Sequence, residues 1–204
     1  MLIVYAILGI TVLMSISAWQ SSELMNRWLM RPYLVRNNNQ WYRFITSGFI
    51  HADWTHLIFN MIGFYTFGIS VYSGYLNYFG NGAIYIFILL YIGGMIVADI
   101  PSYLKHKDHS WYASLGASGA VSAVAMASVL LYPLSSIYMM GILRLPAIVW
   151  AVIYLVSSQY LAQKGGDNIN HSAHFYGALF GIVLTLALKP VIAADFVQQL
   201  FSRN

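Results

Sequence analysis

Gly116-Ala117-Ser118-Gly119, followed by Ala120-Val121-Ser122-Ala123, opens an apolar segment and holds a serine hydroxyl between two glycines. Two other polar clusters occupy matching places. His56-Leu57-Ile58-Phe59-Asn60 opens an earlier apolar segment, and His174-Phe175-Tyr176-Gly177 opens a later one. Ionisable and polar side chains inside a membrane are costly and are functional by default. The arrangement of these clusters therefore decides both the fold and the candidate site.

The composition is that of a membrane protein. Only 8% of the 204 residues are charged and 59% are hydrophobic, whereas soluble domains carry roughly 25% charged residues. The ten basic residues are spread widely, without a basic run interleaved with aromatics, so no nucleic-acid partner is expected. Cysteine is absent, which excludes disulfides and cysteine-based metal sites. We expect the lipid bilayer as solvent and a single domain over residues 1–204.

The apolar runs predict an all-α membrane protein, a bundle of six transmembrane helices. Spanning helices satisfy their backbone internally, and the runs lack the alternation of a β-barrel. The first run has an alternative interpretation as part of a signal peptide, which the later spans disfavour. Residues 20–43, rich in arginine and aromatics, predict a partly helical interfacial loop. The expected spans are 2–19, 56–75, 83–98 (ended by Asp99 and Pro101), 114–132, 147–161 and 171–188, with 102–112 and 133–146 as connections and a short amphipathic tail.

The order of the spans predicts that the polar clusters meet. Consecutive spans alternate in direction, so the second, fourth and sixth begin at the same membrane face. His56 and Asn60 open the second, Ser118 the fourth, and His171 and His174 the sixth. These side chains should therefore lie at similar depth.

Small residues at four-residue spacing predict close contact between the fourth and sixth helices. Gly119 and Ala123 lie on one, and Gly177 and Gly181 on the other. Small-xxx-small ridges let membrane helices approach closely. Such a ridge alone favours a packing motif and nothing more, but the nearby serine and histidine reverse that preference.

The candidate chemistry is acyl transfer. Ser118 as nucleophile needs a base, and a buried histidine such as His174 favours the neutral form that a base requires. No acidic residue falls inside the fourth or sixth helix. We therefore predict a Ser–His dyad without a carboxylate, and Asp167 on the preceding loop is the one candidate third member.

Candidate donors to an oxyanion lie beside the dyad. Asn60 offers a side-chain amide and shares a helix face with His56, four residues earlier. The backbone N–H groups at the start of the fourth helix, around Gly119, add the positive end of a helix dipole. Each polar residue also has a structural interpretation, as a hydrogen bond between helices or back to its own helix, but together on one face they favour function.

The ordered motifs resemble the rhomboid family of intramembrane serine proteases over nearly the whole chain. They are Tyr42-Arg43, His51, His56-x-x-x-Asn60, Gly116-x-Ser118-Gly119 and Ala173-His174-x-x-Gly177-x-x-x-Gly181. The resemblance implies cleavage of transmembrane protein substrates near the membrane boundary, with Ser118 as nucleophile and His174 as base. It assigns Asn60, His56 and the Ser118 N–H to the oxyanion hole and implies no metal or cofactor. It further implies that residues 164–170 cap the site and that the fifth helix moves as a lateral gate.

Two positions depart from the family pattern. Many members have an aromatic residue one turn after the nucleophile, packed against the catalytic histidine, where this chain has Ser122. Tyr112 or Tyr176 is the expected replacement. The family's tryptophan–arginine pair in the first loop is Tyr42-Arg43 here.

The distribution of basic residues conflicts with the family topology. The family places the active face outside the cytoplasm, and a compact six-helix chain suits a bacterial inner membrane. The positive-inside rule favours the opposite orientation. Any first-loop arginine that is buried for structural reasons would count less in that comparison. The residues that would face outward are Arg27, Arg31, Arg36, Arg43, Lys105, Lys107 and Lys164, against Arg144, Lys189 and Arg203 inside.

Three other functions compete with the protease. The first is a catalytically inactive rhomboid-like protein that binds or guides membrane proteins. The second is a metal-dependent membrane protease or transporter using His51, His56, His171 and His174. The chain contains no His-Glu-x-x-His motif, which argues against this function. The third is a channel or carrier, for which paired repeats are expected and not seen.

Overall fold

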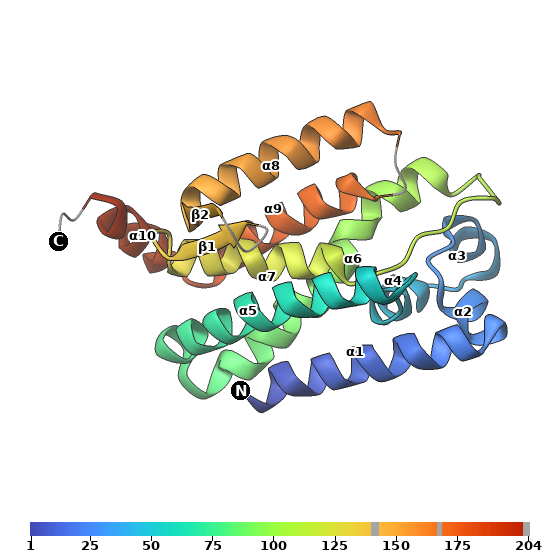
Figure 1. Cartoon of the computed structure of the whole chain (residues 1–204), viewed down its shortest axis with the longest axis horizontal. Helices are drawn as coiled ribbons and strands as arrows, with labels where there is room; N and C mark the ends of the chain where they lie inside the picture. Colours follow the sequence, from blue (N-terminus) through green and yellow to red (C-terminus); the bar gives the residue numbers. More distant parts are fainter. Residues whose placement is uncertain (140–142, 167–168, 202–204) are drawn as a thin grey trace.

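The computed structural model describes residues 1–139, 143–166 and 169–201 of the chain. Helices dominate, and their arrangement is shown in Figure 1. The elements are α1 Leu2–Gln20, α2 Ser22–Trp28, α3 Pro32–Asn38, α4 Arg43–Thr46, η1 Ser47–Phe49, α5 Trp54–Phe79, η2 Gly80–Gly82, α6 Ala83–His106, α7 Ser118–Leu131, β1 Ser136–Met139, β2 Leu143–Pro146, α8 Ala147–Lys164, α9 His171–Leu188 and α10 Val191–Phe201.

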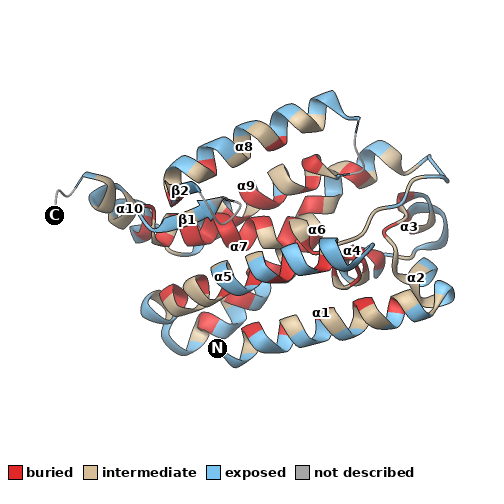
Figure 2. Ribbon diagram, viewed as in Figure 1, coloured by how far each residue is buried: buried red, intermediate tan, exposed pale blue. Residues whose placement is uncertain are grey.

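Helix α7 forms the centre of the bundle. Eleven of its fourteen residues are buried, against α5, α6 and α9 (Figure 2). Fourteen residues reach only about 21 Å, less than the roughly 30 Å hydrocarbon core. Its neighbours shield this short helix from lipid, and the small residues along it allow them to approach closely.

Six long helices, α1 and α5 to α9, stand where the six spans were expected. By length and apolar composition, three stretches of the described chain are able to cross a bilayer: Leu2–Gln20, Trp54–His106 and His171–Leu188. The middle stretch comprises α5 and α6 joined by η2, so it accounts for two crossings. Helix α7, with fourteen residues, is shorter than a helix that spans a bilayer. Helix α8 is long enough, but polar residues in its second half lower its mean hydropathy.

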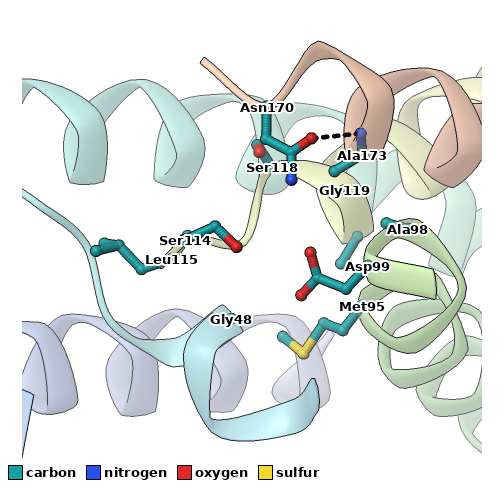
Figure 3. Close-up of a pocket in the computed structure, with 12 residues that line it drawn as sticks. Gly48, Met95, Ala98, Asp99, Ser114, Leu115, Ser118, Gly119, Asn170 and Ala173 are labelled. Carbon is teal, nitrogen blue, oxygen red and sulfur yellow. Dashed lines mark hydrogen bonds between the residues drawn. The ribbon is translucent and has the colours of Figure 1, made fainter. Parts of the chain in front are cut away.

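The expected end of the third span was wrong. Helix α6 continues through Asp99 and Pro101 to His106, so part of the expected 102–112 loop is helical. A proline removes one backbone hydrogen bond, which membrane helices tolerate. The Asp99 side chain faces the protein interior rather than marking a polar boundary (Figure 3).

The fourth helix begins later than expected, at Ser118 rather than near Ser114. The residues before it are held outside the helix because Ser114 forms an antiparallel bridge with Met30 of the first loop, through two backbone hydrogen bonds. This bridge places the turn before α7 against the first loop. Farther along, the 133–146 connection contains the antiparallel pair β1 and β2.

The first loop is partly helical, as its sequence indicates, and Arg43 holds it together. Arg43 is only 3% exposed. It donates to the backbone oxygens of Asn26 and Leu29, at 3.0 and 2.6 Å, and to the side chain of Gln40 at 2.7 Å. Arg43 thereby caps the last turn of α2 and joins it to α4. The positive charge of Arg43 is therefore buried and bonded within the loop, so this arginine carries little weight in the positive-inside count.

The close contact predicted between the fourth and sixth helices is confirmed. A Cβ on Gly177 would lie 2.2 Å from the Gly119 carbonyl oxygen, and one on Gly181 would lie 2.1 Å from that of Ala123. Only glycine permits such an approach of two backbones. The amino-terminal ends of α5, α7 and α9 lie at the same end of the bundle (Figure 1), as alternating spans require.

Candidate active site

A small cavity lies behind the start of α7. Its volume is about 20 Å³, room for about one water molecule. Ser118 and Gly119 contribute one wall, Asp99 of α6 a second, and Ala173 of α9 a third (Figure 3). The buried Ser114 hydroxyl also faces the cavity and has no hydrogen-bond partner among the described residues. The cavity is therefore polar as well as roomy enough for water.

The turn that carries Ser118 requires glycine at position 116. Gly116 has φ +113°, and a Cβ there would lie 2.6 Å from Cε1 of His56. Its N–H donates to the Ser47 carbonyl at 2.9 Å. The His56 ring therefore packs directly on this turn, and Ser118 becomes the first residue of α7, where backbone N–H groups lack helical partners.

His51 fixes the same turn from the other side. Its Nε2 accepts from the Ala117 N–H at 3.3 Å, so this nitrogen carries no proton. In the neutral ring, Nδ1 then carries the proton and donates to Ser15 Oγ of α1 at 3.1 Å. Burial is the main cause that lowers the pKa of His51 to about 3, with a smaller contribution from His56. His51 is thus a neutral link between α1 and the residue before Ser118.

The amino terminus of α9 is tied to α6. Asn170 caps the helix by accepting from the Ala173 N–H at 3.1 Å, and its amide donates to Ser102 Oγ at 2.9 Å. The ring of His171 lies 5.7 Å from that of His174 and nearly perpendicular to it. These contacts fix the first turn of α9, which carries His174, against α6.

Tyr154 of α8 is the aromatic neighbour of His174. The two rings stack with centroids 6.3 Å apart and an interplanar angle of 22°, and the Tyr154 hydroxyl hydrogen-bonds with Ser122. The expectation that Tyr112 or Tyr176 takes this place was wrong. Tyr112 stacks on His106, and Tyr176 is 42% exposed on α9.

The expected oxyanion donors lie on the first turns of α5. The Asn60 amide donates to the His56 carbonyl of its own helix at 2.9 Å. The helix is capped by Asp53, which accepts from the His56 N–H at 2.8 Å. Neither Asn60 nor His56 lines the cavity.

Of the residues singled out in the sequence, Ser118 and Gly119 share the cavity with Ala173, the neighbour of His174. Asp167 lies outside the described residues. Sequence reasoning missed Asp99 and Tyr154. Asp99 was detectable, because a carboxylate late in the third span must lie near the start of the fourth; Tyr154 carried no comparable signal.

The described residues contain no group of three or more His, Asp or Glu side chains that converge on a metal-sized site. The four histidines of the metal hypothesis form two pairs, with ring centroids 4.9 Å apart in one and 5.7 Å apart in the other.

A rhomboid domain matches residues 38–191, which is most of the chain. The chain belongs to the rhomboid family. It is accordingly a multi-pass helical membrane protein. The rhomboid domain starts within the first loop and includes every candidate site residue.

Named rhomboid relatives are similar at modest identity. Rhomboid-like protein 11, chloroplastic, of Arabidopsis thaliana is 32% identical over 176 residues, 81% of this chain and 59% of that protein. Rhomboid-like protein 12, mitochondrial, of the same plant is 26% identical over 171 residues, 74% and 49% of the two chains. Rhomboid protease GluP of Bacillus subtilis (strain 168) is 28% identical over 163 residues, 80% and 29% of the two chains. This rhomboid spans about half the length of the plant relatives.

Proposed function

We propose that this rhomboid is an intramembrane serine endopeptidase that hydrolyses peptide bonds in or near transmembrane segments of membrane protein substrates. Ser118 is the nucleophile and His174 the general base. Asn60, His56 and the backbone N–H groups at Ser118 and Gly119 stabilise the oxyanion. The lipid bilayer surrounds the enzyme, and no metal or cofactor takes part.

The observation that carries this proposal is the contact between α7 and α9. A Cβ on Gly177 would strike the Gly119 carbonyl, and one on Gly119 would lie 3.4 Å from the Ala173 carbonyl. The residue after Ser118 and the residue before His174 are thus neighbours across the helix interface. Both also line the polar cavity, which offers a place for water beside the serine. These contacts support a Ser–His dyad at the amino-terminal ends of the two helices.

Base catalysis proceeds in two stages. His174 takes the Ser118 proton as Oγ attacks the substrate carbonyl, and the proton passes to the departing amine. Donors aimed at the developing oxyanion lower the barrier. Water then attacks the acyl-enzyme, with His174 again as base, and releases the serine.

We propose that the active face lies outside the cytoplasm, in a bacterial inner membrane. The basic residues of the first loop weigh less against this orientation than their number suggests. Arg43 is buried, and Arg36 pairs with Asp108 of the loop before α7. Protease accessibility of residues 164–170 in oriented vesicles tests the proposal, and cleavage from the cytoplasmic side alone would reverse it.

Labelling of the detergent-solubilised protein with a serine-directed fluorophosphonate tests the dyad. We expect label on Ser118 in the wild type, none in Ser118→Ala, and strongly reduced label in His174→Ala. The same variants are compared for cleavage of a transmembrane reporter in liposomes, with and without a chelator. Cleavage that persists in Ser118→Ala, or that the chelator abolishes, contradicts the serine mechanism.

The second candidate is an inactive rhomboid-like protein that binds membrane proteins. The names of two relatives, rhomboid-like proteins 11 and 12, state no protease activity. An intact wild type that neither labels nor cleaves, yet co-purifies with transmembrane segments independently of Ser118, supports this candidate.

A further inference from the structure

A row of aromatic rings leads from α5 across α8 to His174. The ring centroids of Phe67 on α5 and Trp150 on α8 lie 5.5 Å apart. Trp150 stacks on Tyr154 with centroids 4.9 Å apart and an interplanar angle of 22°. Tyr154 then stacks on His174 at 6.3 Å, also at 22°. The ring beside the histidine is therefore supplied by α8 and held in place by a second ring behind it.

The hydroxyl of Tyr154 is anchored to the helix of the candidate nucleophile. Ser122 Oγ donates its single proton to the Ser118 carbonyl at 2.7 Å. The hydrogen bond between Ser122 and Tyr154 must then run from the tyrosine O–H to the serine oxygen. A continuous path results, from Tyr154 through Ser122 to the backbone of Ser118. It joins the neighbour of the histidine to the residue that carries the nucleophile.

Helix α8, which provides this ring, is the least enclosed long helix of the bundle. Only Ala147, Ala151 and Ser158 are buried among its eighteen residues (Figure 2). Much of its surface faces outward, for example Val156 at 65% exposure. Tyr154 contacts both α7 and α9 from the middle of α8, beside the apolar cluster that includes Ala151, Met126 and Ala178.

We propose that Tyr154 is a positioning residue that aligns the His174 imidazole for proton transfer with Ser118, and that it does so only while α8 is docked. This inference rests on the proposed function. Stacking restricts rotation of the imidazole, and the hydroxyl sets the ring at a fixed height along α7. Displacement of α8 withdraws the ring and leaves His174 without that restraint. The pair Ser122 and Tyr154 thus couples the position of one helix to the reactivity of the site.

A double-mutant cycle in the full chain tests the proposal. The variants are Tyr154→Leu, Tyr154→Phe, Ser122→Ala and the double variant Tyr154→Phe with Ser122→Ala. Tyr160→Leu, on the same helix at 60% exposure, is the matched control. Measurements are kcat and KM on a transmembrane reporter in liposomes, the rate of fluorophosphonate labelling of Ser118, and the melting temperature.

We expect Tyr154→Leu to lower kcat and the labelling rate about tenfold, with KM within about twofold of the wild type, because an aromatic pair is lost. Tyr154→Phe keeps the ring and retains most of kcat. The double variant should lose no more than Ser122→Ala alone, because Tyr154→Phe and Ser122→Ala both remove the hydrogen bond between the two side chains. If Tyr154→Leu fails to fold, the phenylalanine and alanine variants carry the test.

A kcat for Tyr154→Leu within about twofold of wild type, a similar loss in Tyr160→Leu, or additive losses in the cycle overturn the positioning role. An active wild type together with an unaffected Tyr154→Leu overturns this inference alone. A folded wild type that neither cleaves nor labels overturns the proposed function, and the positioning role falls with it.

Discussion

The His51 imidazole accepts a hydrogen bond at Nε2 from the backbone N–H of Ala117, the residue that immediately precedes Ser118. The opposite ring nitrogen is bonded to Ser15 of α1. A protonated ring has no acceptor, so the contact with Ala117 exists only while His51 is neutral. The start of α7 is thus connected to α1 through His51, and this connection requires the neutral imidazole.

We expect stability to fall as the pH drops from about 6.5 towards 3. Burial keeps the pKa of His51 at about 3 in the folded chain, whereas an unfolded histidine titrates near 6.5. Between these values the unfolded state binds a proton that the folded state does not, so stability is complete above the unfolded pKa and is lost as the pH falls. The slope from this one group is at most about 1.4 kcal/mol per pH unit.

Melting temperatures in detergent at several pH values measure this effect. His51→Gln should be less stable than wild type at pH 7.5, by about 1–3 kcal/mol, with a shallower decline towards acid. His109→Gln, at an exposed histidine, is the control and should follow the wild-type curve. Parallel curves for wild type and His51→Gln would exclude His51 as the source of the pH dependence.

Gly177→Ala should strongly destabilise the bundle. The added methyl would lie 2.2 Å from the Gly119 carbonyl oxygen, which belongs to backbone and cannot rotate away. Forcing extra volume into a packed interface costs typically about 1–3 kcal/mol, sometimes more, and here the two helices that carry Ser118 and His174 must separate. We therefore expect a lower melting temperature and loss of fluorophosphonate labelling.

Gly9→Ala is the matched control for that substitution. Gly9 lies within α1, and a Cβ there would meet nothing within 4 Å. Alanine is the better helix former by roughly 1 kcal/mol, so the melting temperature should stay the same or rise. Equal losses in Gly9→Ala and Gly177→Ala would contradict the packing explanation, because a methyl at Gly9 has no neighbour to strike and alanine favours the helix.

Segment-level features of the fold were predictable because they depend on local composition. Apolar runs of spanning length, and small residues spaced along them, fixed the helices and the contact of Gly119 with Gly177. Helix ends were less predictable. From the local sequence, Pro101 predicts the end of the helix. Helix α6 nevertheless continues past it, because a helix packed among others tolerates the loss of one backbone hydrogen bond. The Met30–Ser114 bridge, which delays the start of α7, joins residues far apart in sequence and leaves no local mark.

The candidate site divides in the same way. The positions of Ser118 and His174 at helix starts followed from segment order. The partner of His174 did not, because a tyrosine on α8 was indistinguishable from the other aromatics that face lipid. Asp99 was not predicted because it lies on neither helix of the candidate dyad, whereas the cavity has a third wall on α6.

Arg43→Lys should destabilise the first loop although the charge is retained. The guanidinium donates in several directions at once, to Gln40 and to the carbonyls of Asn26 and Leu29. An ammonium group is a point donor on a different stem and cannot reproduce that fork. We expect a loss of about 2 kcal/mol, measured as a shift of the melting temperature.

Arg36→Lys tests whether this loss is specific to the buried site. Arg36 pairs with Asp108, and both side chains are largely exposed, at 48% and 64%. Exposed ion pairs contribute less than about 1 kcal/mol, so this variant should melt within a few degrees of wild type. An equal shift in the two variants would point to a general intolerance of lysine in the loop, rather than to the capping role of Arg43.

Asn60→Ala should lower turnover far more than stability. In the free protein the Asn60 amide donates to the carbonyl of His56 on its own helix, a bond that fastens no second helix. Its loss costs folding little, whereas removal of one oxyanion donor typically lowers kcat about 10²–10³-fold. Asn77→Ala, at an exposed asparagine farther along α5, is the control for both measurements. If Asn60→Ala keeps its kcat in liposomes while its melting temperature falls well below that of Asn77→Ala, Asn60 holds helices together and the oxyanion must be bound by other groups.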